Sequence, residues 1–229
     1  MIKAILFDLD GTLLNREKSL SRFLKEQYQH FGKKFPHVSQ KAFTQRFIEL
    51  DVKGMVWKDV VYKTLVSEFQ ITTVSWQDLL SDYIEHFHAY CVAFSGVHSA
   101  LKQLKKQGYP LGLITNGLYP FQFHNMQALN LEPYFSVILV SEKEGIRKPA
   151  PAIFHKATGF LNIKNEEAVY IGDNPKTDIE GARLAGLKAV WKRNPDWDSC
   201  PSSDGEFEKF HELSGLIANL QGLETHLKG

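Results

Sequence analysis

The chain has 229 residues, and its 27 basic and 26 acidic side chains leave a formal net charge of +1. This balance excludes the strongly basic surface of a nucleic-acid-binding protein and provides no attraction to an anionic membrane. The two cysteines, Cys91 and Cys200, are too far apart for a paired zinc motif or a disulfide scaffold. The apolar stretches are too short for a membrane span or a signal peptide. We therefore expect a soluble cytoplasmic protein without nucleic-acid or membrane partners.

The first predicted element is a buried strand at residues 2–7, which runs directly into the sequence DLDGTL at positions 8–13. A short apolar run closed by a glycine turn is typical of a parallel sheet. Ligands of such sheets bind beyond the carboxyl ends of the strands, where Asp8 and Asp10 follow. Two buried acids so close together require a cation nearby. One of them could then act as a ligand or nucleophile while the other transfers protons.

A helical segment is predicted over residues 15–92. The next buried strand begins only at Leu111, whereas a strand–helix–strand unit needs about thirty residues. The surplus residues must therefore form an insertion. Amphipathic helix patterns, several of them starting at a serine suited to capping, occur at residues 19–31, 39–51, 57–69 and 75–90. Most of the many aromatic residues in this segment must form its own core. We expect an inserted all-helical domain here, with residues 1–14 and 93–229 forming an α/β core.

From residue 95 onward, the pattern alternates between helices and strands. Short apolar runs predict strands at residues 111–115, 137–140, 168–171 and 188–191. Helical patterns occupy residues 95–107, 121–129, 151–160 and 177–184. A turn-rich stretch then precedes a short strand near residues 207–210 and a last helix at about 213–220. This alternation indicates an α/β fold, a doubly wound parallel sheet with helices on both faces.

A candidate anion site follows the strand predicted at residues 111–115. Thr115, Asn116 and Gly117 place a hydroxyl, an amide and a flexible turn at its end. Such a turn presents backbone N–H groups that bind anions, although the same residues also occur in ordinary loops. Lys148 precedes Pro149, which favours an extended backbone and lets the lysine project from its loop. It could supply the cation that two crowded acids require.

Two further acids follow the strand predicted at residues 168–171. Asp173 and Asp178 emerge there, at the carboxyl edge that also carries the first two acids. Carboxylates and backbone carbonyls are suitable ligands for a hard divalent cation. Asp178 also suits the first turn of the following helix, where its charge interacts favourably with the helix dipole.

These four stretches, taken in chain order, resemble the four motifs of the haloacid dehalogenase-like (HAD) hydrolase superfamily. The resemblance covers residues 1 to about 191 and is vaguest over residues 15–95. Thr115 corresponds to the Ser or Thr of the family's second motif, and Lys148 to the lysine of its third. The resemblance implies a HAD-like, Rossmann-like core with a helical cap inserted between the first and second motifs.

The resemblance also implies a mechanism of phosphate transfer. Asp8 would attack phosphorus and form an aspartyl-phosphate that water hydrolyses, and Asp10 would protonate the leaving group and deprotonate the water. Mg²⁺ would be held by Asp8, the backbone carbonyl of Asp10 and Asp173, with Asp178 acting indirectly, for instance through water. The groups expected to hold the phosphoryl oxygens or stabilise their charge are Thr115, Asn116, Gly117 and Lys148.

We therefore expect a Mg²⁺-dependent phosphatase of a small phosphorylated metabolite, a monomer or homodimer. The sequence Thr-Asn-Gly at positions 115–117 resembles nucleotidase-like and phosphoglycolate phosphatase-like members, which hints at a nucleoside monophosphate or a phosphoglycolate-like substrate. A sugar-phosphate phosphomutase uses the same paired acids and stays an alternative. A dehalogenase would lack the acid at position 10. A non-catalytic binding module would have lost at least one motif residue, and all of them are present.

Overall fold

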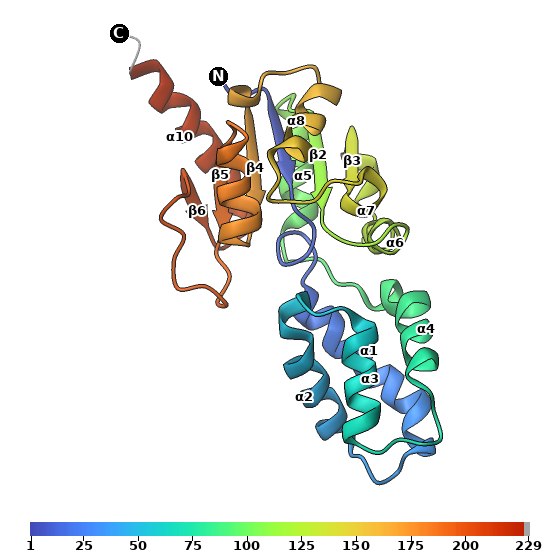
Figure 1. Cartoon of the computed structure of the whole chain (residues 1–229). Coiled ribbons are helices and arrows are strands. Elements are labelled where there is room, and N and C mark those ends of the chain that lie inside the picture. The colour runs from blue at the N-terminus through green and yellow to red at the C-terminus, as the bar shows by residue number, and fades with distance from the viewer. Residues whose placement is uncertain (227–229) are drawn as a thin grey trace. The chain divides into compact units, whose positions relative to one another are not determined.

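The computed structural model of the protein describes residues 1–226 (Figure 1). The chain divides into two compact units, which we call the α/β unit (Met1–Asn15 with Val92–Gly229) and the helical unit (Arg16–Cys91). The α/β unit is closed where the chain leaves and re-enters it, because the N–H of Asn15 donates to the carbonyl of Val92 at 2.8 Å. No helix in the described part of the chain is long and apolar enough to cross a membrane.

The α/β unit contains a six-stranded sheet in the order β3-β2-β1-β4-β5-β6, and every pairing is parallel. The strands are β1 (Ala4–Phe7), β2 (Leu111–Thr115), β3 (Val137–Val140), β4 (Ala168–Gly172), β5 (Lys188–Lys192) and β6 (Gly205–Phe207). β1, β2 and β4 are buried along their whole length, which explains their continuous apolar sequences. The chain reverses its winding direction at β1, and folds of this kind bind ligands at the carboxyl ends of the strands there.

Helices cover both faces of this sheet (Figure 1). On one face, α8 (Pro151–Phe160) and α9 (Gly181–Leu184) share an apolar core with β4 and β5. On the other, α5 (Val97–Lys106) contacts α10 (Leu213–His226). Two short helices, α6 (Phe121–Ala128) and α7 (Ser141–Glu144), follow β2 and β3. The predicted doubly wound α/β fold is confirmed.

Three C-terminal elements differ from the sequence expectation. The helix predicted at residues 177–184 is a π-helix (Pro175–Glu180) followed by α9. It starts early because the Asn174 side chain accepts hydrogen bonds from the N–H groups of Lys176 and Thr177, and proline suits a first turn. The last strand lies slightly earlier than residues 207–210, and α10 extends beyond residue 220.

The helical unit contains α1 (Arg16–Phe31), α2 (Gln40–Asp51), α3 (Lys58–Glu68) and α4 (Trp76–His86). Ser39 and Ser75 cap α2 and α4 as expected, because their hydroxyls accept the N–H groups of Ala42 and Asp78. Ser19 is not a cap, since α1 begins three residues before it. The buried core of the unit is largely aromatic, with Phe23, Phe43, Phe47, Tyr62, Tyr83 and Phe87. That the helical unit acts as a cap over the substrate stays a prediction.

Candidate active site

The carboxyl edge of the sheet gathers the residues that the sequence singled out. Asp8 follows β1, Thr115 ends β2 and Asp173 follows β4. Phe7 pairs with Leu113 of β2 and with Ile171 of β4, so these strand ends lie at nearly the same level. Lys148 reaches them from the loop between α7 and α8.

Lys148 forms the centre of a buried ion cluster. Its Nζ donates to Oδ1 of Asp8 at 2.6 Å, to Oδ1 of Asp178 at 2.6 Å and to the hydroxyl of Tyr170 at 2.8 Å. Lys148 is only 3% exposed. Burial alone would lower the pKa of Lys148, but the carboxylates of Asp178 and Asp8 outweigh it and raise this pKa above its usual value. The ammonium therefore stays charged with all three of its N–H donors in use.

Asn116 holds the Lys148 loop in place. The N–H of Lys148 donates to Oδ1 of Asn116 at 2.9 Å, and Nδ2 of Asn116 donates to the Lys148 carbonyl at 3.0 Å. The next backbone N–H, that of Gly117, donates to the Ser141 hydroxyl at 3.0 Å. Two of the groups expected to bind phosphate, the Asn116 side chain and the Gly117 N–H, thus have partners within the protein.

Three acids lie close enough to share a cation. Carboxylate oxygens of Asp8, Asp173 and Asp178 are all within 4.8 Å of one another. Burial, followed by the charge of Asp178, raises the pKa of Asp173 to about 7. Burial also raises the pKa of Asp8 well above its usual value, although Lys148 opposes this shift. One lysine does not neutralise three buried carboxylates, so the cluster is electrostatically incomplete.

The donor atoms of this cluster suit a hard divalent cation. Oγ1 of Thr12 lies 3.2 Å from Oδ2 of Asp8 and 3.4 Å from Oδ1 of Asp173, and its single proton can be donated to only one of them at a time. Gly11 has φ +80°, and a Cβ there would be 2.2 Å from Oδ2 of Asp173. Glycine thus lets the backbone next to Asp10 approach this carboxylate closely. Carboxylates beside a close-lying backbone fit Mg²⁺.

Asp10 is held separately, by Gln122 of α6. Within the described residues, the carboxylate of Asp10 is not one of those that could share the ion. Nε2 of Gln122 donates to Oδ2 of Asp10 at 2.5 Å, to the Thr115 hydroxyl at 3.1 Å and to the Asn116 carbonyl at 3.1 Å. Its Oε1 accepts Nδ2 of the fully buried Asn125, which orients the amide. Gln122 therefore connects the second acid to the end of β2.

Comparison with known proteins agrees with this geometry. The family of haloacid dehalogenase-like hydrolases matches residues 5–192 of the chain. The chain belongs to this family. It is 31% identical over 194 residues to the glyceraldehyde 3-phosphate phosphatase of Pyrococcus furiosus, covering 83% of this chain and 80% of the relative. It is 30% identical over 218 residues to the ribulose-1,5-bisphosphate 5-phosphatase of Halopiger xanaduensis, covering 89% and 90%.

A solved structure shows the same fold. The HAD phosphatase of Thermococcus onnurineus superposes with a TM-score of 0.69 at 26% identity, covering 94% of this chain and 98% of that one. The agreement of family, relatives and fold makes this chain a HAD-like phosphoric monoester hydrolase.

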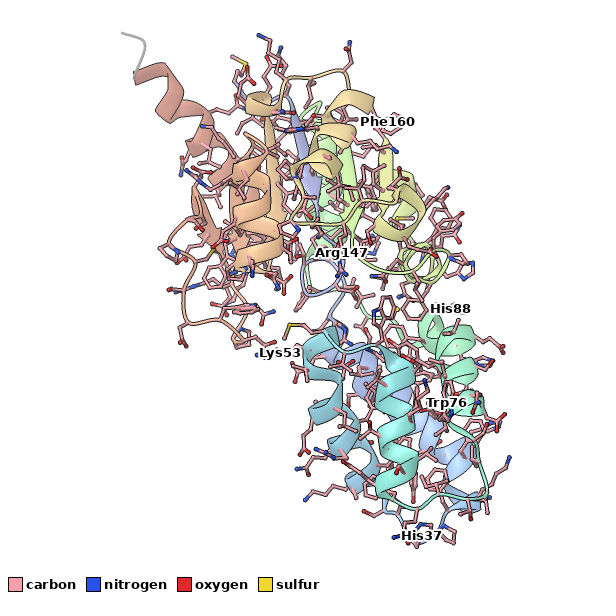
Figure 2. All side chains as sticks on the ribbon, in the orientation of Figure 1. His37, Lys53, Trp76, His88, Arg147 and Phe160 are labelled. Atoms are coloured by element: carbon pink, nitrogen blue, oxygen red, sulfur yellow. The ribbon has the colours of Figure 1, made fainter. Side chains whose placement is uncertain are left out.

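Four polar contacts of this HAD hydrolase were not expected from the sequence. Thr12 lay inside the first motif, and the hydroxyl of Tyr170 stood out as a polar group in a buried strand, so both carried a signal. Gln122 and Asn194, whose Nδ2 donates to Oδ2 of Asp173 at 2.6 Å, carried none, because only folding brings them to the site. Arg147, beside Lys148 in the sequence, is exposed on the α/β unit (Figure 2).

Proposed function

We propose that this HAD hydrolase is a Mg²⁺-dependent phosphatase that hydrolyses a small phosphomonoester through an aspartyl-phosphate on Asp8. The observation that carries the proposal is the buried contact of Lys148 with Asp8 and Asp178, beside Asp173, whose carboxyl group forms no ion pair within the described residues. The relatives' names support a phosphorylated metabolite of low molecular weight, since they include phosphatases of a triose phosphate, a ribulose bisphosphate and phosphoglycolate.

Asp8 is the proposed nucleophile. Lys148 donates to its Oδ1 at 2.6 Å, and among the described side chains its Oδ2 accepts a hydrogen bond only from the Thr12 hydroxyl, at 3.2 Å. Attack of a carboxylate oxygen on phosphorus displaces the alcohol and leaves the phosphoryl group on Asp8. The residues that would hold Mg²⁺ are Asp8, the backbone carbonyl of Asp10 and Asp173, with Asp178 acting indirectly, and the bound ion would offset the charge of carboxylates and phosphate.

Asp10 is the proposed acid and base. It would give a proton to the leaving oxygen and later take one from the water that hydrolyses the aspartyl-phosphate. Its contact with Gln122 keeps the carboxylate beside Thr115, the residue proposed to hold the phosphoryl oxygens. Lys148 would stabilise the charge that develops on the nucleophile and the phosphoryl group.

A panel of phosphorylated metabolites, assayed for inorganic phosphate with Mg²⁺ and with EDTA, tests this function. We expect hydrolysis that EDTA abolishes and added Mg²⁺ restores. Asp8→Asn should lower turnover at least about a thousandfold, since an amide is a poor nucleophile. Asp59→Asn should not, because Asp59 is an acid of the helical unit whose side chain is 39% exposed in its ion pair with Lys63. Activity of Asp8→Asn within about tenfold of the wild type would contradict the covalent mechanism. Conversion of a sugar phosphate into its isomer, without phosphate release, would indicate a mutase.

A further inference from the structure

Lys192, the last residue of β5, is a buried lysine without a role in the steps above. Its side chain is only 4% exposed, and its Nζ lies 3.7 Å from the centre of the Phe94 ring. Among residues 1–226, no hydrogen bond or ion pair engages this ammonium. It differs in this respect from Lys148, whose three N–H donors all have acceptors.

A buried ammonium without hydrogen-bond acceptors is unfavourable. The aromatic face of Phe94 offsets part of this penalty. Burial accordingly lowers the pKa of Lys192, although the charge of Asp173 opposes the shift. Although the Nζ atom has no hydrogen-bond acceptor among the described residues, it is not fully enclosed by protein atoms. It therefore stays in contact with solvent. A ligand can therefore reach it and supply the missing acceptor.

The sheet register places Lys192 next to the candidate active site. Gly172 of β4 pairs with Trp191 of β5, so Asp173 and Lys192 follow at the same level on neighbouring strands. The adjacent turn also contacts the site, because Asn194 donates to Asp173 at 2.6 Å. β4 separates β5 from β1, and strands are about 4.8 Å apart, so Lys192 starts roughly 10 Å from the strand of Asp8.

We propose that Lys192 binds a second anionic group of the substrate, a carboxylate or a second phosphate several bonds from the phosphorus that is attacked. The inference rests on the proposed function, because it assumes that a phosphomonoester occupies the neighbouring site. The transferred phosphoryl group itself belongs at the other side of β4, beside Asp8 and Lys148. The enzyme is thus specific for small phosphomonoesters that carry a further negative charge.

Binding of two phosphonates that cannot be hydrolysed tests the proposal without requiring turnover. 3-Phosphonopropionate ends in a carboxylate, whereas 3-hydroxypropylphosphonate ends in a neutral hydroxyl. Calorimetry in the presence of Mg²⁺ should show that the wild type prefers the carboxylate by tenfold or more, on the order expected of a hydrogen bond to a charged group. Lys192→Met should abolish this preference and leave the affinity for the neutral compound unchanged.

Lys188→Met, the same substitution at the opposite end of β5, is the matched control and should keep the preference. The melting temperature of Lys192→Met should not fall, because methionine packs well on the ring of Phe94. Equal binding of both compounds by the wild type overturns the proposal. An equal loss of affinity for both compounds in Lys192→Met also overturns it, because this result would show a long-range effect on the acidic cluster of Asp8, Asp173 and Asp178.

The proposed function fails by a different result. Absence of phosphate release from every ester of the metabolite panel, with the carboxylate preference intact, would leave Lys192 as an anion-binding residue of a protein that is not a phosphatase. Phosphate release together with equal binding of the two phosphonates would leave the phosphatase standing and remove Lys192 from substrate recognition.

Discussion

The ammonium of Lys148 lies 2.6 Å from Oδ1 of Asp8, and this contact joins residues 140 positions apart in the sequence. The lysine that follows the third strand is thereby the counter-ion of the acid that follows the first. Because Asp178 binds the same ammonium at 2.6 Å, one cation holds two buried carboxylates. Several properties of the protein depend on this arrangement.

Replacing Lys148 should destabilise the metal-free protein strongly. Lys148→Met leaves Asp8 and Asp178 buried without their cation, and loss of one partner of a buried ion pair typically costs about 3–5 kcal/mol. Urea unfolding in EDTA at pH 8 measures the change in the free energy of unfolding. Lys156→Met is the control, since Lys156 is 39% exposed in its ion pair with Glu144 and should contribute less than about 1 kcal/mol. Similar effects of the two substitutions would contradict the electrostatic role of Lys148.

The stability of the metal-free protein should fall as the pH rises from about 4 to about 7. The pKa of Asp173 is raised from 3.8 to about 7, so the folded state keeps a proton that the unfolded chain releases in this window. Its contribution to stability is therefore present below pH 4 and lost on passing pH 7. Melting temperatures in EDTA check the sign, and Asp173→Asn should flatten the curve. If stability rises over this window in the wild type but not in Asp173→Asn, the pKa of Asp173 is not raised in the folded protein.

Bound Mg²⁺ should reverse this trend. The ion requires ionised carboxylates, so its stabilising effect should be larger at pH 8 than at pH 5. The difference between melting temperatures with Mg²⁺ and with EDTA, measured at both pH values, provides the test. An equal difference at both pH values would mean that the ion does not bind at the carboxyl groups of Asp8 and Asp173, whose pKa values are raised.

Gly11→Ala should be more destabilising than Gly108→Ala. Both glycines have positive φ, +80° and +88°, so both substitutions carry the strain of the left-handed region, about 1–2 kcal/mol. Only at Gly11 does the added Cβ meet another group, Oδ2 of Asp173 at 2.2 Å, whereas nothing lies within 4 Å at Gly108. Urea unfolding gives the two free energies, and Mg²⁺ titration should show weaker binding for Gly11→Ala alone. Equal destabilisation would mean that the loop moves away from Asp173 without penalty.

Gln122→Met should impair proton transfer more than phosphate binding. It removes the donor that holds Asp10, so turnover of alkyl phosphates should fall by up to about 10²–10⁴, the usual contribution of an acid or base. An aryl phosphate with an acidic phenol should lose less in single-turnover phosphorylation, since its leaving group needs no proton. Gln127→Met, on the exposed side of the same helix, should resemble the wild type. Equal losses for both kinds of ester would indicate a structural role for Gln122.

The sequence by itself determined the class of fold and most of its elements. Short apolar runs alternating with helical patterns predicted β1 to β5 within a few residues, because central parallel strands are buried on both faces and need continuous apolar side chains. The positions of Asp8, Thr115 and Asp173 at strand ends were visible for the same reason. The serine caps at residues 39 and 75 were predicted because a cap acts on N–H groups only a few positions away.

Only the tertiary structure decided how these strand ends are connected. Gln122 meets Asp10 across 112 positions and Asn194 meets Asp173 across 21, and no local pattern marks either amide. Asn116 binds the Lys148 loop, although its place at a strand end suggested a phosphate ligand. The burial of Lys192 over Phe94 depends on the packing of β5 against the segment before α5. Secondary structure depends on neighbours along the chain, whereas these contacts depend on the order of the strands in the sheet.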